Sequence, residues 1–221
     1  MITSTLKKQL FLISSLVLVG CTSDDREVIL PPDPNNFIVS DPVLTPAPMA
    51  QFESRNWSMF TDRAASHYGI DKNLIKAIIH VESGGNPKAV SSANAIGLMQ
   101  IKAVSAGREI YRLRGQYRDP SSQELKNPAI NIDIGSAYIK YLQDTELVGI
   151  TDPLTLRYAT IVSYCNGAGA LLRIFSRKRQ NAIDKINAMT PQQFYYYVLR
   201  THPAAQAPQY LVKVTHAYQQ S

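Results

Sequence analysis

Residues 71–84 read DKNLIKAIIHVESG, a stretch that predicts one amphipathic helix together with both of its ends. Asp71 precedes the helical run as a side-chain cap, and Gly84 stands where a left-handed helix terminator belongs. Steps of four residues along the apolar stripe lead through Ile78 to Glu82, so an acidic residue continues that stripe. The stretch therefore predicts a helix that packs on a core and carries a carboxylate at its end.

The same helical pattern continues through the chain from Trp57 onward. Three further caps are followed directly by proline at the first helical position, where the missing N–H costs nothing: Asn127-Pro128, Asp152-Pro153 and Thr190-Pro191. Alternating strand-like stretches are hard to find, and the sequence has no internal repeat or second linker. We expect a mainly α fold of about eight helices in a single domain over residues 51–221, with at most a small β element.

The first twenty residues have the pattern of an export signal. Lys7 and Lys8 precede about ten mostly apolar residues, a run too short for a membrane span of roughly twenty. The run ends in Leu18-Val19-Gly20-Cys21, which resembles the lipobox of bacterial lipoproteins. This resemblance implies that residues 1–20 are a removed signal peptide and that Cys21 is acylated. The alternative is a cleaved signal peptide that happens to precede a cysteine.

A proline-rich segment follows the cysteine. Residues 22–50 hold six of the thirteen prolines of the chain, a composition that favours polyproline II over packing. We expect residues 21–50 to be a lipidated cysteine and a tether, which can span several nanometres at roughly 3 Å per residue. In lipoproteins of this kind, a residue such as Thr22 after the cysteine favours export to the outer membrane, with the folded domain on its periplasmic side.

The composition excludes several classes of protein. With 45% hydrophobic and 18% charged residues among 221, the chain is not disordered throughout. Two cysteines and four scattered histidines offer no disulfide framework and no zinc-ligand spacing, so we expect neither a metal site nor a cofactor. The formal charge of +6 divides into +2 for residues 1–20, −4 for residues 22–50 and +8 for the remainder.

The basic remainder contains one dense cluster of cations: Arg173, Arg177, Lys178, Arg179 and Lys185. Nucleic acid is a common partner of such clusters, but the export signal argues against it here. We expect instead a solvated face that is attracted to anionic wall polymer or to lipid headgroups.

The position of Glu82 predicts a carboxyl group that keeps its proton near neutral pH. The residue lies on the core-facing stripe, and also in the last helical turn, where the helix dipole disfavours a negative charge. Both effects raise the pKa of a carboxyl group, as a general acid requires. The alternative is a helix-end glutamate that turns to solvent or pairs with a nearby base such as Lys102.

Several separated motifs give this acid a context. They are Glu82-Ser83-Gly84-Gly85-Asn86-Pro87, Ala89-Val90-Ser91, Ala95-Ile96-Gly97-Leu98-Met99-Gln100-Ile101 and Tyr164-Cys165-Asn166-Gly167-Ala168-Gly169. With these motifs in this order, the chain resembles the soluble lytic transglycosylase family of glycoside hydrolases, which has a goose-type lysozyme-like domain. The match spans roughly Trp57 to Tyr218 and is strongest to the small, endo-type, membrane-bound members, which are lipoproteins.

The resemblance implies a role for each matching residue. Glu82 matches the catalytic acid and base, and Ser91 matches the serine that positions the acid and the N-acetyl group of the sugar. The other substrate-binding positions are Gly97, Met99 and Gln100 around the scissile sugar, Tyr164 and Asn166 of the Tyr-x-Asn motif, and Tyr210 near the acid. The chain departs from close relatives at Ala93, where they have a serine, so a bond from that hydroxyl is absent here or is supplied by Ser92 or water.

The motifs hold no second acid beside Glu82, whereas ordinary glycosidases use two carboxylates. The resemblance implies that the substrate supplies the missing nucleophile, and that peptidoglycan strands are cleaved between N-acetylmuramic acid and N-acetylglucosamine to give 1,6-anhydromuramoyl ends. We therefore expect a lytic transglycosylase, endo-acting and used in cell wall remodelling. Two alternatives stay open: a muramidase-type hydrolase on the same fold, which needs a positioned water and a second acid, and a non-catalytic peptidoglycan-binding lipoprotein.

Overall fold

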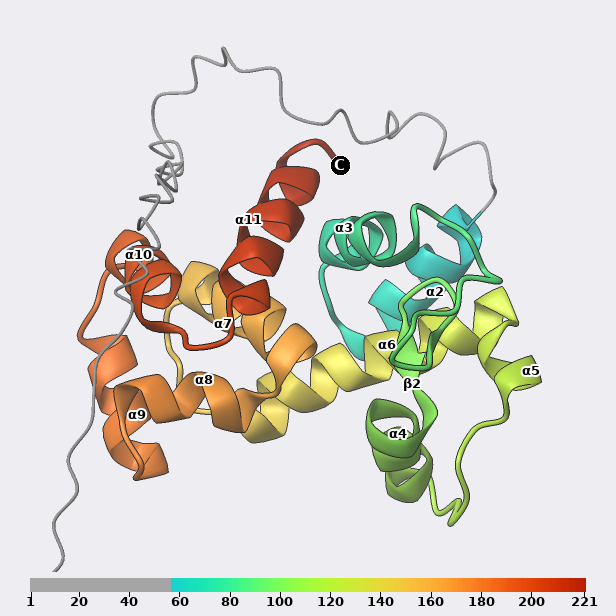
Figure 1. Ribbon diagram of the computed structural model, residues 1–221, viewed down its shortest axis with the longest axis horizontal. Coiled ribbons are helices and arrows are strands. Elements are labelled where there is room, and N and C mark those ends of the chain that lie inside the picture. Colours follow the sequence, from blue (N-terminus) through green and yellow to red (C-terminus); the bar gives the residue numbers. More distant parts are fainter. Residues whose placement is uncertain (1–56) are drawn as a thin grey trace, which may run out of the picture. The chain divides into compact units, whose positions relative to one another are not determined.

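Helices dominate the computed structural model, which describes residues 57–221 (Figure 1). This part of the chain holds ten α-helices, two π-helical segments and two short β-strands. In chain order they are α2 (Ser58–Tyr68), α3 (Lys72–Ser83), β1 (Ala95–Ile96), β2 (Ile101–Lys102), η1 (Ala103–Gly107), α4 (Arg108–Leu113), α5 (Ser122–Leu125), α6 (Pro128–Tyr141), η2 (Leu142–Glu146), α7 (Pro153–Asn166), α8 (Ala168–Phe175), α9 (Arg179–Asn187), α10 (Pro191–Thr201) and α11 (Gln206–Gln219).

The mainly α fold with one small β element is confirmed. There are more helices than the eight expected, because α4 and α5 have only six and four residues and are too short to give an apolar repeat. The described residues fall within one compact unit, and no helix among them is long and apolar enough to cross a membrane. The predicted signal peptide, Cys21 and the tether lie outside the described residues.

Side-chain caps begin the helices where the sequence predicted them. Asp71 caps α3 by accepting a hydrogen bond at 2.9 Å from the backbone N–H two residues on. Asn127, Asp152 and Thr190 cap α6, α7 and α10 by accepting backbone N–H groups two or three residues on, each directly before a proline. Gly84 ends α3 in the left-handed conformation with φ of 57°. Local sequence therefore fixes the end of α3, where Glu82 lies.

The C-terminal helix α11 packs against both α3 and α7 (Figure 1). From α3, Leu74, Ile75, Ile78 and Ile79 are completely or almost completely buried in the core, as their spacing predicted. Because α3 carries Glu82 and α7 ends at Asn166, the packing of α11 brings residues of three distant segments to one place.

The β element is a hairpin that follows α3. Strands β1 and β2 are antiparallel, pairing Ala95 with Lys102 and Ile96 with Ile101. The turn between them contains Gly97 with φ of 82° and Gln100 with φ of 46°, both in the left-handed region. Ser83, next to Glu82, donates a hydrogen bond to the carbonyl oxygen of Leu98 at 2.8 Å, which joins the hairpin to the end of α3.

One buried amide holds this hairpin in place. Asn131 of α6 is 0% exposed, and its Oδ1 accepts the N–H of Met99 at 2.8 Å. Its Nδ2 donates to the carbonyl oxygens of Ile96 at 2.9 Å and Leu125 at 2.7 Å. A Cβ added to Gly97 would lie 2.3 Å from that Nδ2, so only glycine fits. The hairpin is thus bonded directly to the core, because a buried amide must find partners there.

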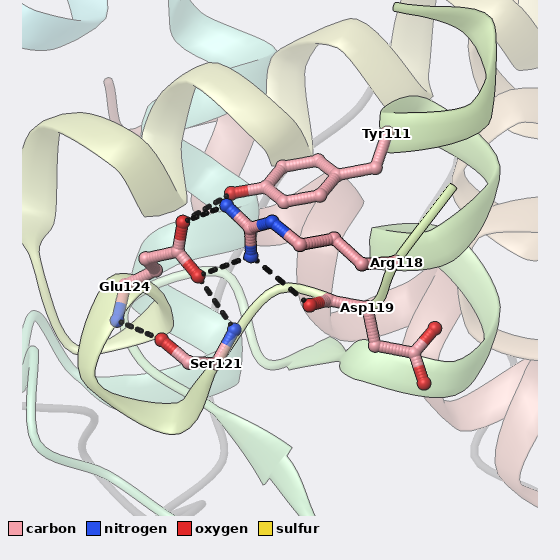
Figure 2. Close-up of polar contacts among 5 residues, drawn as sticks. All are labelled: Tyr111, Arg118, Asp119, Ser121 and Glu124. Carbon is pink, nitrogen blue, oxygen red and sulfur yellow. Dashed lines mark hydrogen bonds and ion pairs between the residues drawn. The ribbon is translucent and has the colours of Figure 1, made fainter. Parts of the chain in front are cut away.

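The connection between α4 and α5 is held by a second polar network (Figure 2). Arg118 forms two hydrogen bonds with the carboxylate of Glu124, at 2.7 and 2.8 Å, and its guanidinium lies 4.9 Å from the ring centre of Tyr111. Glu124 also accepts the N–H of Ser121, whose hydroxyl accepts the N–H of Glu124 in return. The Arg118 guanidinium holds the pKa of Glu124 well below its usual range. This network fixes a surface loop and does not include Glu82.

Part of the predicted basic face has a structural role. The guanidinium of Arg179 donates to the carbonyl oxygens of Thr145, Glu146 and Val148, and Lys185 donates to that of Phe175 at 2.9 Å. These two cations therefore satisfy backbone carbonyls near helix ends, where positive charge is favourable.

Candidate active site

Glu82 lies in the last turn of α3 and is partly buried, as its place on the apolar stripe predicted. Its Oε1 accepts a hydrogen bond at 2.7 Å from the hydroxyl of Tyr210 on α11. Burial raises the pKa of Glu82 to about 7, while the hydrogen bond from Tyr210 acts in the opposite direction. The carboxyl group is therefore poised to exchange a proton near neutral pH.

The alternative of an ion pair between Glu82 and Lys102 is not observed. Ion pairs between residues 57–221 include neither residue. Lys102 lies on β2, near the thiol of Cys165. Burial and the charge of Glu82 raise the pKa of that thiol to about 11, and the charge of Lys102 acts in the opposite direction. Lys102 thus lies near the site without neutralising the acid, and Cys165 is a protonated thiol at neutral pH.

Tyr164 of α7 binds the hairpin near the acid. Its hydroxyl donates to the carbonyl oxygen of Met99 at 2.8 Å, and its ring meets that of Tyr138 edge-on at 5.7 Å between centres. Burial, and then the charge of Glu82, raise the pKa of Tyr164 well above its ordinary value. The phenol is therefore a fixed hydrogen-bond donor beside the acid.

The hairpin residues contribute mainly through their backbone. The side chain of Met99 is 0% exposed and packs against Gly135, where an added Cβ would lie 2.4 Å from the sulfur. Gly97 is buried as well, and the amide of Gln100 donates to its carbonyl oxygen at 3.0 Å. Of the three positions predicted to hold the scissile sugar, only Gln100 keeps a partly exposed side chain.

Ser91 lies in the loop before the hairpin. Its hydroxyl accepts the N–H of Ala95 at 3.0 Å, and its own N–H donates to the carbonyl oxygen of Ala95 at 2.9 Å. The contacts among residues 57–221 do not include a bond between Ser91 and Glu82. Ser92 and Ala93 are exposed in the same turn, so the position of the missing serine faces solvent.

The last residue of α7, Asn166, is held by two donors. Its Oδ1 accepts from Nε2 of Gln206 at 2.8 Å and from the thiol of Cys165 at 3.2 Å. Sequence reasoning missed Gln206, although it stands four residues before Tyr210 on the same helix. It also missed Asn131, whose only signal is a polar residue within the apolar pattern of α6.

A cavity of about 330 Å³ lies between η1, α4, α6, η2 and α8. It is lined by Tyr138, which contacts Tyr164, and by Tyr141, Glu109 and Glu146 among others. Its aromatic walls are of the kind that pack on sugar faces. Residues 57–221 contain no group of three or more histidines, cysteines or acids placed to hold a metal ion.

Known proteins share both the sequence and the fold. Residues 59–187 match the family model described as the transglycosylase SLT domain. The endo-type membrane-bound lytic murein transglycosylase A of Cronobacter sakazakii is 54% identical over 161 residues, which cover 73% of this chain and 79% of that protein. The protein of the same name from Salmonella paratyphi B is 50% identical with the same coverage.

A likeness in structure accompanies these matches. The 70 kDa soluble lytic transglycosylase of Escherichia coli superposes with a TM-score of 0.54 at 22% identity, over 72% of this chain and 23% of that much longer protein. This likeness concerns the fold alone. The family model matches more than half of the sequence and the relatives are 50–54% identical, so the chain belongs to the transglycosylase SLT domain family.

Proposed function

We propose that this protein is a peptidoglycan lytic transglycosylase that cleaves the β-1,4 bond between N-acetylmuramic acid and N-acetylglucosamine and leaves 1,6-anhydromuramoyl ends. The observation that carries the proposal is one carboxyl group, Glu82, with a pKa of about 7 and a fixed phenol donor. Relatives that are 50–54% identical are named lytic murein transglycosylases, which supports peptidoglycan as the substrate.

The pKa of Glu82 also supports a single-carboxylate mechanism. In two-carboxylate glycosidases the acids lie roughly 5–5.5 Å or 6.5–9.5 Å apart. A second carboxylate so close would raise the pKa of Glu82 by repulsion, yet among residues 57–221 only burial and Tyr210 contribute to its shift. In this proposal the substrate itself supplies the nucleophile.

The reaction has two steps that use the same carboxyl group. First, Glu82 gives its proton to the oxygen that leaves with N-acetylglucosamine, the bond from C1 to that oxygen breaks, and the N-acetyl carbonyl oxygen of muramic acid bonds to C1 as an oxazolinium. Next, the 6-hydroxyl of the same sugar attacks C1, the oxazolinium bond breaks, and Glu82 takes the hydroxyl proton. The 1,6-anhydro ring closes, no water is consumed, and Glu82 is again protonated.

The neighbouring residues bind the sugar in this proposal. Gln100, Asn166 and the free proton of the Ser91 hydroxyl offer polar contacts, while Tyr164 and Tyr210 fix the acid and its surroundings. Gly97 and Met99, whose side-chain positions are buried, act by shaping the backbone of the hairpin. The aromatic cavity beside Tyr138 offers room for further sugars of the strand, as an endo-acting enzyme requires.

We also propose that the protein is held at a membrane. The relatives are named membrane-bound, which supports membrane association. The lipobox-like ending at Cys21 supports a lipid anchor, and Thr22 supports the periplasmic side of the outer membrane. Peptidoglycan lies within reach of such an anchor through the tether of residues 22–50.

Mass spectrometry of purified sacculi digested with the protein tests the reaction. We expect fragments with 1,6-anhydromuramoyl ends, of varied length, from the wild type and none from Glu82→Gln, whose circular dichroism stays that of the wild type. Reducing muramic acid ends would establish the hydrolase instead, and the absence of any cleavage by the wild type would establish a binding protein.

A further inference from the structure

The side-chain oxygen of Asn166 is fully occupied by protein. An amide oxygen has two lone pairs, and Oδ1 of Asn166 accepts from Gln206 Nε2 at 2.8 Å and from Cys165 Sγ at 3.2 Å. Two donors on one side of an amide fix which way it points. The amide nitrogen Nδ2 consequently keeps both of its N–H groups unpaired among residues 57–221, and Asn166 is only partly buried.

The donor Gln206 belongs to the same helix as Tyr210. They are the first and fifth residues of α11, and residues four apart lie on one face of a helix. From that face Tyr210 reaches Glu82 at 2.7 Å and Gln206 reaches Asn166 at 2.8 Å. One helix face therefore holds both the acid on α3 and the amide at the end of α7.

We infer that Gln206 is a positioning residue for cleavage: by occupying Oδ1 of Asn166 it turns the two N–H donors of Nδ2 toward an acceptor oxygen of the bound N-acetyl sugar. This inference rests on the proposed function, since it assigns a task within the same site. Cys165 assists as the second donor to the same oxygen, at 3.2 Å.

Gln206→Glu reverses the polarity of this contact. An ionised carboxylate at position 206 cannot donate to Oδ1 of Asn166, but it can accept from Nδ2. It therefore favours an Asn166 amide rotated by 180°, with Oδ1 and Nδ2 exchanged. We expect kcat/KM for sacculi or soluble glycan strands to fall about tenfold at pH 7, the loss of one positioned hydrogen bond, mainly through KM. As the pH falls toward the usual glutamate pKa of about 4.3, the protonated side chain donates again and the ratio of variant to wild type rises.

Gln209→Glu is the matched control. Gln209 is exposed on the same helix and makes no contact with Asn166. The substitution Gln209→Glu therefore adds the same charge without changing the contact to the Asn166 amide. Gln206→Met should lose activity at every pH, and Cys165→Ser, which keeps a donor, should stay near the wild type. Equal activity of Gln206→Glu and Gln209→Glu, or a ratio to the wild type that does not change with pH, would overturn the inference. A failure of the proposed function itself is distinguishable, because the wild type would then form no anhydro ends.

Discussion

The hydroxyl of Tyr210 lies 2.7 Å from Oε1 of Glu82, although 128 residues separate the two in sequence. Burial favours the protonated form of Glu82, and the hydrogen bond from Tyr210 favours the carboxylate. The two effects together leave the pKa at about 7, where the group can both give and take a proton. Tyr210 is therefore a tuning residue as well as a contact.

Removal of this hydroxyl should shift the pH dependence of cleavage. In Tyr210→Phe, burial acts on Glu82 without opposition, so its pKa rises above the wild-type value of about 7. Because the first step needs a protonated acid, the alkaline limb of kcat/KM should move to higher pH, and kcat should fall about tenfold as the acid loses its orientation.

A control for this variant lies on the same helix. Tyr218 also donates its hydroxyl to a carboxylate, that of Asp71, at the far end of α11 from the acid. Tyr218→Phe should leave the pH profile unchanged. Coincident profiles for Tyr210→Phe and the wild type would contradict the tuning role.

The raised pKa of Glu82 predicts a pH-dependent cost in stability. Between about pH 4.5 and 7 the folded chain binds a proton that the unfolded chain does not, so the free energy of unfolding falls as the pH rises through this window. Glutamine carries no such penalty. Glu82→Gln should therefore be more stable than the wild type by about 1–3 kcal/mol at pH 8, with no such gain at pH 4.

Urea unfolding at the two pH values measures this difference. Glu109→Gln is a suitable comparison, because its hydrogen bonds with Arg112 lower the pKa of Glu109 instead of raising it. Substitution there should give no gain in stability at pH 8. Equal gains for both variants would show that the loss of a negative charge, and not the burial of Glu82, is responsible.

The hairpin should tolerate no side chain at Gly97. In Gly97→Ala the new Cβ would lie 2.3 Å from Asn131 Nδ2 and from the carbonyl oxygen of Leu125, in a left-handed conformation with φ of 82°. The crowding and the backbone strain together should lower the free energy of unfolding by about 2–5 kcal/mol.

Gly84→Ala separates the two causes. Gly84 is also left-handed, with φ of 57°, but an added Cβ would meet no atom within 4 Å. The free energy of unfolding of Gly84→Ala should fall by only about 1–2 kcal/mol, the cost of the backbone conformation alone. Chemical denaturation of both variants gives the comparison, and equal losses would mean that the contact with Asn131 costs nothing.

Metabolic labelling with palmitate tests the lipid anchor. The wild type should be labelled and Cys21→Ala should not, because Cys21 is the proposed acylation site. Cys165→Ala removes the other cysteine of the chain and should remain labelled. Labelling of Cys21→Ala at the wild-type level would refute the anchor.

The sequence was informative where local patterns decide the structure. The caps at Asp71 and Asn127, the terminator at Gly84 and the burial of Glu82 follow from spacing and side-chain chemistry within one or two helical turns. These features predicted the helical class and one acid with a raised pKa.

Contacts between distant segments could not be predicted in this way. Asn131 looks like an ordinary polar residue of α6, and only the folded chain shows that its amide bonds the hairpin. Likewise, nothing near Gln206 in the sequence indicates that it meets Asn166 forty residues away. The motif around Met99 places it in the strip that holds the scissile sugar, but it does not indicate that the Met99 side chain packs in the core against Gly135. Each of these three contacts depends on how whole helices pack.

The location of α11 sets the order in which the site matures. A ribosome completes Glu82 and Asn166 before it makes Tyr210 and Gln206, which bind them. The acid thus gains its phenol partner only when the last helix docks on α3 and α7. Before that docking, Glu82 lacks the hydrogen bond that opposes the effect of burial on its pKa.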